Sequence, residues 1–125
     1  IAFLGRLPNA EMPGLLSSGD LAVFPSLMEA TSVAALEAMS CALPVAASRV
    51  GGLPEIVDER VGALFEPGDP RSLAGVVVGL LESGRLKELG RQARELVVAR
   101  WSNDRLADRH LEIYRSLIQR RGRAS

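Results

Sequence analysis

Short apolar runs alternate with amphipathic stretches along the chain. Runs that are apolar throughout predict buried strands, and spacings of three and four between apolar positions predict helices. The predicted strands are residues 1–4, 21–25, 44–47 and 61–65. The predicted helices are residues 9–16, 32–41, 70–82 and 87–100, with a helical turn at 53–57 and a last helix after residue 102. Strands of this kind alternating with helices indicate the α/β class, with a parallel sheet covered by helices on both faces.

Polar and glycine residues mark the ends of several of these elements. Asn9 is the predicted cap of the first helix, and Gly19 its stop. Thr31 or Ser32 would cap the second helix. Asp69 followed by proline is a strong start signal for the helix at 70–82, and Ser102 would cap the last helix. The tail, residues 120–125, is expected to fray.

Composition narrows the class of protein. The chain has 125 residues, of which 47% are hydrophobic and 24% charged, and this favours one globular domain. Fifteen basic and fifteen acidic side chains cancel, which argues against general nucleic-acid binding. The single cysteine, Cys41, excludes an intrachain disulfide, favours a reducing compartment and is expected to pack in the core. No apolar run approaches the ~20 residues of a membrane span.

The chemistry-bearing residues concentrate between Phe24 and Val57. In an open parallel sheet, ligands bind beyond the carboxyl ends of the strands, and Glu29 follows such an end. The helix that comes next offers free N–H groups near Thr31, Ser32 and Val33, and its dipole suits a phosphate. The alternative is that Thr31 and Ser32 only cap the helix.

Two carboxylates, Glu29 and Glu37, lie eight positions apart in surroundings that are otherwise apolar. A carboxylate in such a place needs hydrogen-bond partners. Sugar hydroxyls would supply them for Glu29, and the two adjacent hydroxyls of a ribose would supply them for Glu37. The alternatives are a salt bridge at Glu29 and a solvent-exposed helix position at Glu37. Gly51-Gly52 could bring backbone close to a ligand.

Other reactive side chains are sparse. With one histidine, His110, and one cysteine, neither a zinc site nor a Cys–His nucleophile pair is expected, and His110 is expected at the surface or at an interface. The arginines at the end of the chain suit either a solvated helix face or a contact with a membrane surface. They are Arg115, Arg120, Arg121 and Arg123.

Longer stretches of the sequence resemble one enzyme family. LEAMSCALPVAASRVGGLPEIV is similar to its LEAMACG-PV-A---GG-PEIV segment, and the spacing of Glu29 and Glu37 matches its E-x7-E motif. GALFEPGDPRSLA and WSNDRLADRHLEIYRSL resemble the elements that follow this segment. The family is that of the retaining glycosyltransferases of group 1 (family 4-like), which have two Rossmann-like domains in the GT-B fold. The resemblance covers nearly the whole chain and implies a donor-binding, C-terminal domain.

The resemblance implies a role for each site residue. Glu29, as the catalytic residue, would face the donor sugar, and Glu37 would bind the ribose of a nucleotide sugar such as a UDP- or GDP-sugar. Neither a cofactor nor a metal is expected. Backbone between the two would hold the sugar and diphosphate, and the loop after the first strand would border the base. These binding residues are Ala30, Thr31, Ser32 and Val33 for the first group, and Gly5, Arg6 and Leu7 for the second.

The sequence departs from the family pattern at three places. Ala30-Thr31-Ser32 replaces the common Gly-Phe-Gly, and Ala42-Leu43 stands where a glycine usually precedes Pro-Val. The family's Arg and Lys, which clamp the donor diphosphate, have no match, because Arg6 is only 23 positions before Glu29 and no Lys follows in range. Residues 1–125 are therefore interpreted as part of the donor domain, without its first strands and without the acceptor domain.

This interpretation carries further expectations. The parent protein would be a hexosyltransferase-type enzyme in the cytoplasm, either free or peripherally bound to a membrane. It would transfer the sugar, with retention of the anomeric configuration, to a glycan, a lipid or a small molecule. The chain alone is expected to be inactive and, with Ile1, Phe3 and Leu4 poorly covered, to self-associate. Two alternatives stay open: another enzyme on the same scaffold, such as a nucleotide-sugar epimerase or a sugar phosphorylase, and a non-catalytic binding module.

Overall fold

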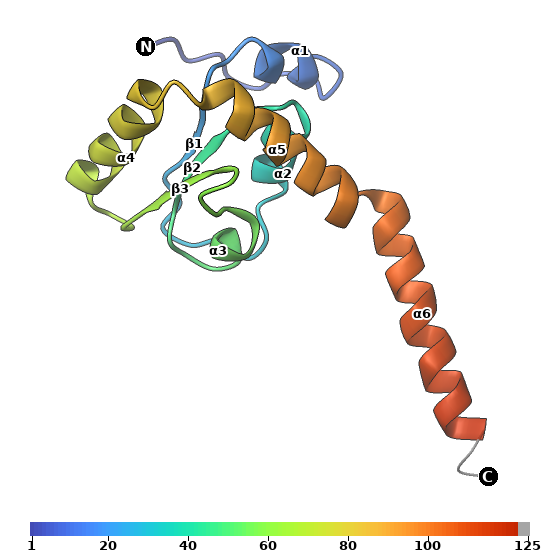
Figure 1. Ribbon diagram of the computed structural model, residues 1–125. Helices are drawn as coiled ribbons and strands as arrows, with labels where there is room; N and C mark the ends of the chain where they lie inside the picture. Colours follow the sequence, from blue (N-terminus) through green and yellow to red (C-terminus); the bar gives the residue numbers. More distant parts are fainter. Residues whose placement is uncertain (123–125) are drawn as a thin grey trace.

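A three-stranded parallel sheet forms the centre of the molecule (Figure 1). The computed structural model describes residues 1–122. The strands are β1 (Ala22–Phe24), β2 (Val45–Ser48) and β3 (Gly62–Phe65), in the order β1-β2-β3. Both pairs are parallel, with Ala22 opposite Val45 and Val45 opposite Gly62. Three of the predicted strands are therefore confirmed, each within one residue at its start, and so is the α/β class.

Helices cover both faces of this sheet, as predicted. They are α1 (Met12–Ser17), α2 (Val33–Ser40), α3 (Leu53–Ile56), α4 (Pro70–Glu82), α5 (Leu86–Arg100) and α6 (Asn103–Gly122). The middle strand shows how the layers form, because successive side chains of a strand point to opposite faces. Val45 and Ala47 belong to the core that α2, α3 and α5 cover, whereas Ala46 belongs to the core under α4.

Three of the predicted helix caps are confirmed, at Ser32, Asp69 and Ser102, and the one at Asn9 is wrong. The Asp69 carboxylate accepts hydrogen bonds from the N–H groups of Arg71 at 2.9 Å and Ser72 at 3.1 Å, so α4 begins at Pro70 as expected. Ser32 caps α2, which ends at Ser40 with the half-buried Cys41 just beyond it. Asn9 does not cap α1. That helix begins three residues later, and the backbone carbonyl of Asn9 accepts from Met12 instead.

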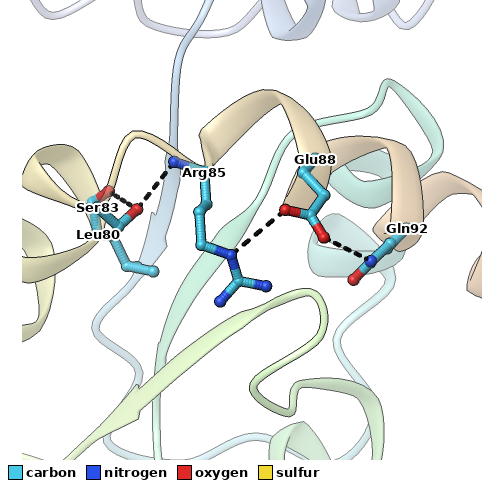
Figure 2. Close-up of polar contacts among 5 residues, drawn as sticks. All are labelled: Leu80, Ser83, Arg85, Glu88 and Gln92. Carbon is cyan, nitrogen blue, oxygen red and sulfur yellow. Dashed lines mark hydrogen bonds and ion pairs between the residues drawn. The ribbon is translucent and has the colours of Figure 1, made fainter.

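A short polar network turns the chain from α4 into α5 (Figure 2). The Ser83 hydroxyl donates to the Leu80 carbonyl at 2.7 Å and accepts from the Arg85 N–H at 3.1 Å. Glu88, in the first turn of α5, lies 3.3 Å from the Arg85 Nε and also accepts from the Gln92 amide at 3.1 Å. These local bonds set the direction of α5, which then packs Leu89, Ala93 and Val97 into the core.

The prediction of a strand at residues 1–4 is wrong. This segment has no regular structure and lies beside α1 (Figure 1). Phe3 is 96% exposed, and Ile1 and Leu4 are exposed as well, so the expectation that these apolar side chains are poorly covered is confirmed. The physical reason is the lack of a partner, because a strand needs a neighbour for its backbone groups and no strand of residues 1–122 pairs with this segment.

The last helix, α6, extends away from the rest of the molecule (Figure 1). It follows a cap by Ser102, whose hydroxyl accepts from the Arg105 N–H at 3.4 Å. Residues 120–122 are helical, so the predicted fraying is wrong for them, and residues 123–125 lie outside the described chain. His110 is exposed on this helix, as expected. Across residues 1–122, no helix is both long enough and apolar enough to cross a bilayer.

A strained residue joins α2 to β2. Ala42 has a φ of 61°, in the left-handed region that glycine adopts without cost. It stands at the position where the group 1 glycosyltransferase pattern that the sequence resembles has glycine. Its N–H donates to Met39 O at 3.0 Å, and the next N–H, of Leu43, donates to Ala38 O at 3.1 Å. The end of the helix therefore requires this conformation, whichever residue occupies it.

Replacing Ala42 by glycine should therefore stabilise the protein. We expect Ala42→Gly to raise the free energy of unfolding by about 1 kcal/mol, the cost of the left-handed conformation for a residue with a Cβ. Urea-induced unfolding measures this change. Ala74→Gly, at an exposed position inside α4, is the matched control and should lower the free energy of unfolding by about 1 kcal/mol. Destabilisation by both substitutions would contradict the strain at Ala42.

Candidate functional site

The loops that follow the three strands meet at the carboxyl edge of the sheet. Ser48, the last residue of β2, donates a hydrogen bond to the Ser26 carbonyl at 2.5 Å in the loop after β1. The Arg49 N–H donates to Phe65 O at 2.8 Å, and the Arg49 side chain lies 3.5 Å from Glu66. The loops after β1 and β3 are thus both attached to the end of β2. This is the edge at which open parallel sheets bind ligands.

Glu29 lies in the loop between β1 and α2 and is half-buried. Its carboxylate makes no hydrogen bond or ion pair with any residue in the described part of the chain. The salt bridge that was the alternative reading does not form within residues 1–122. A partly desolvated carboxylate without a protein partner is a strong acceptor for hydroxyl groups of a ligand.

The amino end of α2 begins just after Glu29. The buried Ser32 hydroxyl accepts a hydrogen bond from the Ala35 N–H at 3.3 Å, so this side chain is a helix cap. The N–H groups of Val33 and Ala34 donate to no acceptor within residues 1–122. Together with the helix dipole, these donors make the start of α2 suited to an anion. Thr31 is exposed beside them.

Glu37 lies in the second turn of α2 and is exposed. The helix buries Ala35, Ala38 and Met39 instead, which leaves Glu37 on the outward side. Like Glu29, its carboxylate has no ion-pair partner in the described chain. The exposure agrees with the alternative of a solvated helix residue, and it also leaves the carboxylate accessible to a ligand at this edge.

The predicted base-binding residues are not brought to this edge. Gly5, Arg6 and Leu7 belong to the irregular segment beside α1, at the end of the sheet where β1 begins (Figure 1). The described chain therefore unites Glu29 with the start of α2 but separates both from residues 5–7. The contact of residues 5–7 with a base stays a prediction.

Two contacts of this loop were not predicted from the sequence, one from Ser48 and one from the glycine pair. Ser48 is only 1% exposed and ends a strand of small apolar residues, where a hydroxyl needs an acceptor. That isolated hydroxyl was the available signal. Gly51 and Gly52 do permit a close approach, but the group they approach is the backbone of Glu29 and Ala30. Only a structure could show which backbone lies against them.

Other polar features lie away from this edge. Arg60 donates a hydrogen bond to Asp58 at 2.9 Å, before β3, and this bond holds the pKa of Asp58 below its ordinary value. Three surface hollows lie against α5 and α6, and neither Glu29 nor Glu37 lines any of them. Within the described residues, no three His, Cys, Asp or Glu side chains are grouped to hold a metal ion.

Comparison with known proteins decides the family. Residues 1–83 match the family model described as glycosyl transferases group 1. The chain belongs to this family. It is 38% identical over 117 residues to the MMP α-(1→4)-mannosyltransferase of Mycolicibacterium hassiacum, an alignment that covers 91% of the chain and 28% of that enzyme. The chain spans less than a third of the length of the curated relatives that it matches most strongly.

Solved structures place this group 1 glycosyltransferase domain in the same fold. Sucrose-phosphate synthase from Thermosynechococcus elongatus superimposes with a TM-score of 0.86 at 32% identity, covering 94% of the chain and 30% of that protein. HepE from Anabaena, solved in complex with UDP-glucose, gives a TM-score of 0.80 at 26% identity, covering 91% of the chain and 32% of HepE. The chain is thus a Rossmann-like, C-terminal-type domain of the GT-B fold, as the sequence predicted.

Substitution at the two hydroxyl residues before α2 should show which of them caps the helix. Ser32→Ala removes the cap of α2 and should lower the free energy of unfolding by about 1 kcal/mol. Thr31→Ala removes an exposed hydroxyl that makes no hydrogen bond in the described chain. This substitution should change the free energy of unfolding by less than about 0.5 kcal/mol. Urea-induced unfolding compares the two. Equal losses would mean that Thr31 shares the capping role.

Proposed function

We propose that the protein containing this chain transfers a sugar from a nucleotide-sugar donor to an acceptor, with retention of the anomeric configuration. The observation that carries this proposal is the pairing of two features at one edge of the sheet. One is the half-buried carboxylate of Glu29, which has no partner in residues 1–122. The other is the start of α2, where the N–H groups of Val33 and Ala34 are unused within the same residues.

The chemistry of the donor assigns a role to each feature. When the bond from the anomeric carbon to the diphosphate oxygen breaks, positive charge develops on the sugar and negative charge on the leaving diphosphate. The N–H groups and dipole at the start of α2, with Ala30, Thr31, Ser32 and Val33 around them, stabilise the diphosphate. Glu29 orients the sugar through its hydroxyls. Glu37, further along the same helix, binds the ribose.

Relatives of the chain support a nucleotide-sugar donor. HepE is known in complex with UDP-glucose, and the relative from Mycolicibacterium hassiacum is a mannosyltransferase. We infer that the donor is a UDP- or GDP-hexose and that a further domain, outside these residues, binds a glycan, lipid or small-molecule acceptor. Residues 1–125 would then be part of the donor domain. We place the protein in the cytoplasm, where nucleotide sugars are available.

A transfer assay on the full-length protein tests the proposal. Nucleotide sugars are incubated with candidate acceptors, and the anomeric configuration of the product is read by NMR. An α-linked product from an α-configured donor supports retention, whereas a β-linked product contradicts it. Conversion of the donor to its epimer without transfer, or phosphate-dependent cleavage of a glycan, would instead favour the alternative enzymes. Binding of nucleoside diphosphates without turnover of any donor would favour a binding module.

The two carboxylates should respond differently to removal. In the full-length protein, Glu37→Ala should weaken nucleoside diphosphate binding about ten- to a hundredfold, because a hydrogen bond to a charged group contributes ~1.5–3 kcal/mol. Glu29→Ala should lower kcat more than it weakens that binding, because its contacts lie at the reacting sugar. Calorimetry and steady-state kinetics give both values. Glu95→Ala, on α5, is the control, and wild-type kinetics in both site variants would refute the assignment.

The 125-residue chain by itself should show no turnover. The physical reason is that the described residues offer helix donors to the diphosphate but no matched Arg and Lys clamp, and that an acceptor must be held against the sugar. Release of nucleoside diphosphate from UDP-glucose or GDP-mannose is the measurement, with the full-length protein as the positive control. Turnover by the isolated chain at a rate near that of the full-length protein would show that these residues suffice.

A further inference from the structure

The loop that carries Glu29 has little packing to hold it. Leu27 is 76% exposed and Met28 90% exposed, although both are apolar and directly precede Glu29. Side-chain burial therefore cannot fix the backbone of this loop. Its position must depend on the few hydrogen bonds and close backbone contacts that it makes with neighbouring segments.

The first of these contacts comes from Ser48. This side chain ends β2 and is 1% exposed, and its hydroxyl lies 2.5 Å from the Ser26 carbonyl and 3.2 Å from the Phe24 carbonyl. One hydroxyl proton serves both acceptors, with the shorter bond to Ser26. The bond therefore fastens the start of the Glu29 loop to the most buried strand of the sheet.

The second contact comes from the glycine pair in the loop after β2. The Gly52 N–H donates a hydrogen bond to the Ala30 carbonyl at 2.8 Å. Gly51 has a φ of 51°, and a Cβ at this position would overlap the Glu29 carbonyl oxygen. The carbonyl groups of Glu29 and Ala30 thus lie directly against Gly51 and Gly52. A larger residue at either glycine would displace the backbone of the Glu29 loop.

We propose that Ser48 and the Gly51–Gly52 pair are positioning residues that hold the backbone of Glu29 against the amino end of α2. This inference rests on the proposed function of Glu29. Ser48 touches neither the donor nor the acceptor and acts only through the loop. The rival reading is a purely structural role, in which loss of these contacts lowers stability but leaves the turnover of the folded protein unchanged.

Kinetics of the full-length protein distinguish the two readings. Ser48→Ala and Gly51→Ala should each lower kcat about ten- to a hundredfold, the scale of a displacement near 1 Å at a reacting centre, with a smaller change in the affinity for UDP or GDP. Ser48→Thr keeps the hydroxyl and should retain most of the kcat. Gly90→Ala is the steric control, because its Cβ would overlap the Ala42 carbonyl at the opposite end of α2. It should lower stability but retain kcat.

Hydrogen exchange provides a readout that does not need turnover. In Ser48→Ala, the exchange of the Gly52 N–H, which donates to the Ala30 carbonyl of the loop, should accelerate at least tenfold, whereas the exchange of amides in α4 and α5 should not. Faster exchange together with lower kcat supports the proposal. Unchanged exchange overturns it, and so does faster exchange with wild-type kcat, or an equal loss of kcat in Gly90→Ala.

The same measurements separate this inference from the proposed function. If Glu29→Ala lowers kcat while Ser48→Ala and Gly51→Ala do not, the function stands and the positioning role falls. If the wild-type protein transfers no sugar, the proposed function falls. Hydrogen exchange in Ser48→Ala then decides whether the Ser48 hydrogen bonds hold the Glu29 loop in place. Unchanged exchange would overturn that role of Ser48.

Discussion

Burial of β2 on both faces and both edges is the constraint on which the rest of this structure depends. All four of its residues are buried, and it pairs with β1 on one side and β3 on the other. Its two alanines are small enough for helical layers to approach from both sides, with Ala46 facing α4 and Ala47 facing α2 and α5. A larger side chain at either position would push a layer away from the sheet. Residues of β2 therefore contribute to the hydrophobic cores on both faces of the sheet.

The candidate site takes its geometry from the end of that same strand. Ser48 and Gly52 follow one another closely in sequence, yet they reach two separate carbonyls in the loop after β1. The buried strand is thus connected to an exposed loop by one side-chain hydroxyl and one backbone N–H. This arrangement leaves the side chains of the loop free for a ligand. Glu29 can be accessible and fixed at once, a combination that a buried salt bridge would not allow.

Much of the fold followed from local signals in the sequence. The Asp69-Pro70 pair predicted the start of α4 to the residue, and the apolar runs gave three parallel strands. Prediction failed where a result depended on distant partners. Residues 1–4 have the composition of a strand but find no neighbour in the described chain, and Asn9 has the chemistry of a cap but does not lie at a helix start.

The site shows the same division. The spacing of Glu29 and Glu37 and the helix that carries Glu37 could be predicted, because both depend on residues close in sequence. The contacts of Ser48 with the loop were not, since they join residues 22 and 24 positions apart. The left-handed Ala42 is an intermediate case. The family pattern indicated a glycine at this position, but only the backbone φ angle shows that the alanine adopts the left-handed conformation.

The isolated position of α6 has a consequence for how the chain opens. The side chains of residues 103–121 are all exposed, so this helix gains almost nothing from burial, and a single helix in water is only marginally stable. Local unfolding of α6 therefore has a free energy set by its own hydrogen bonds and is independent of the sheet, whose amides exchange only when the core opens. We therefore expect α6 to unfold separately from the sheet and its covering helices. A surface that covers the exposed Leu111, Tyr114 and Ile118 would couple α6 to that surface, so that the two would unfold together.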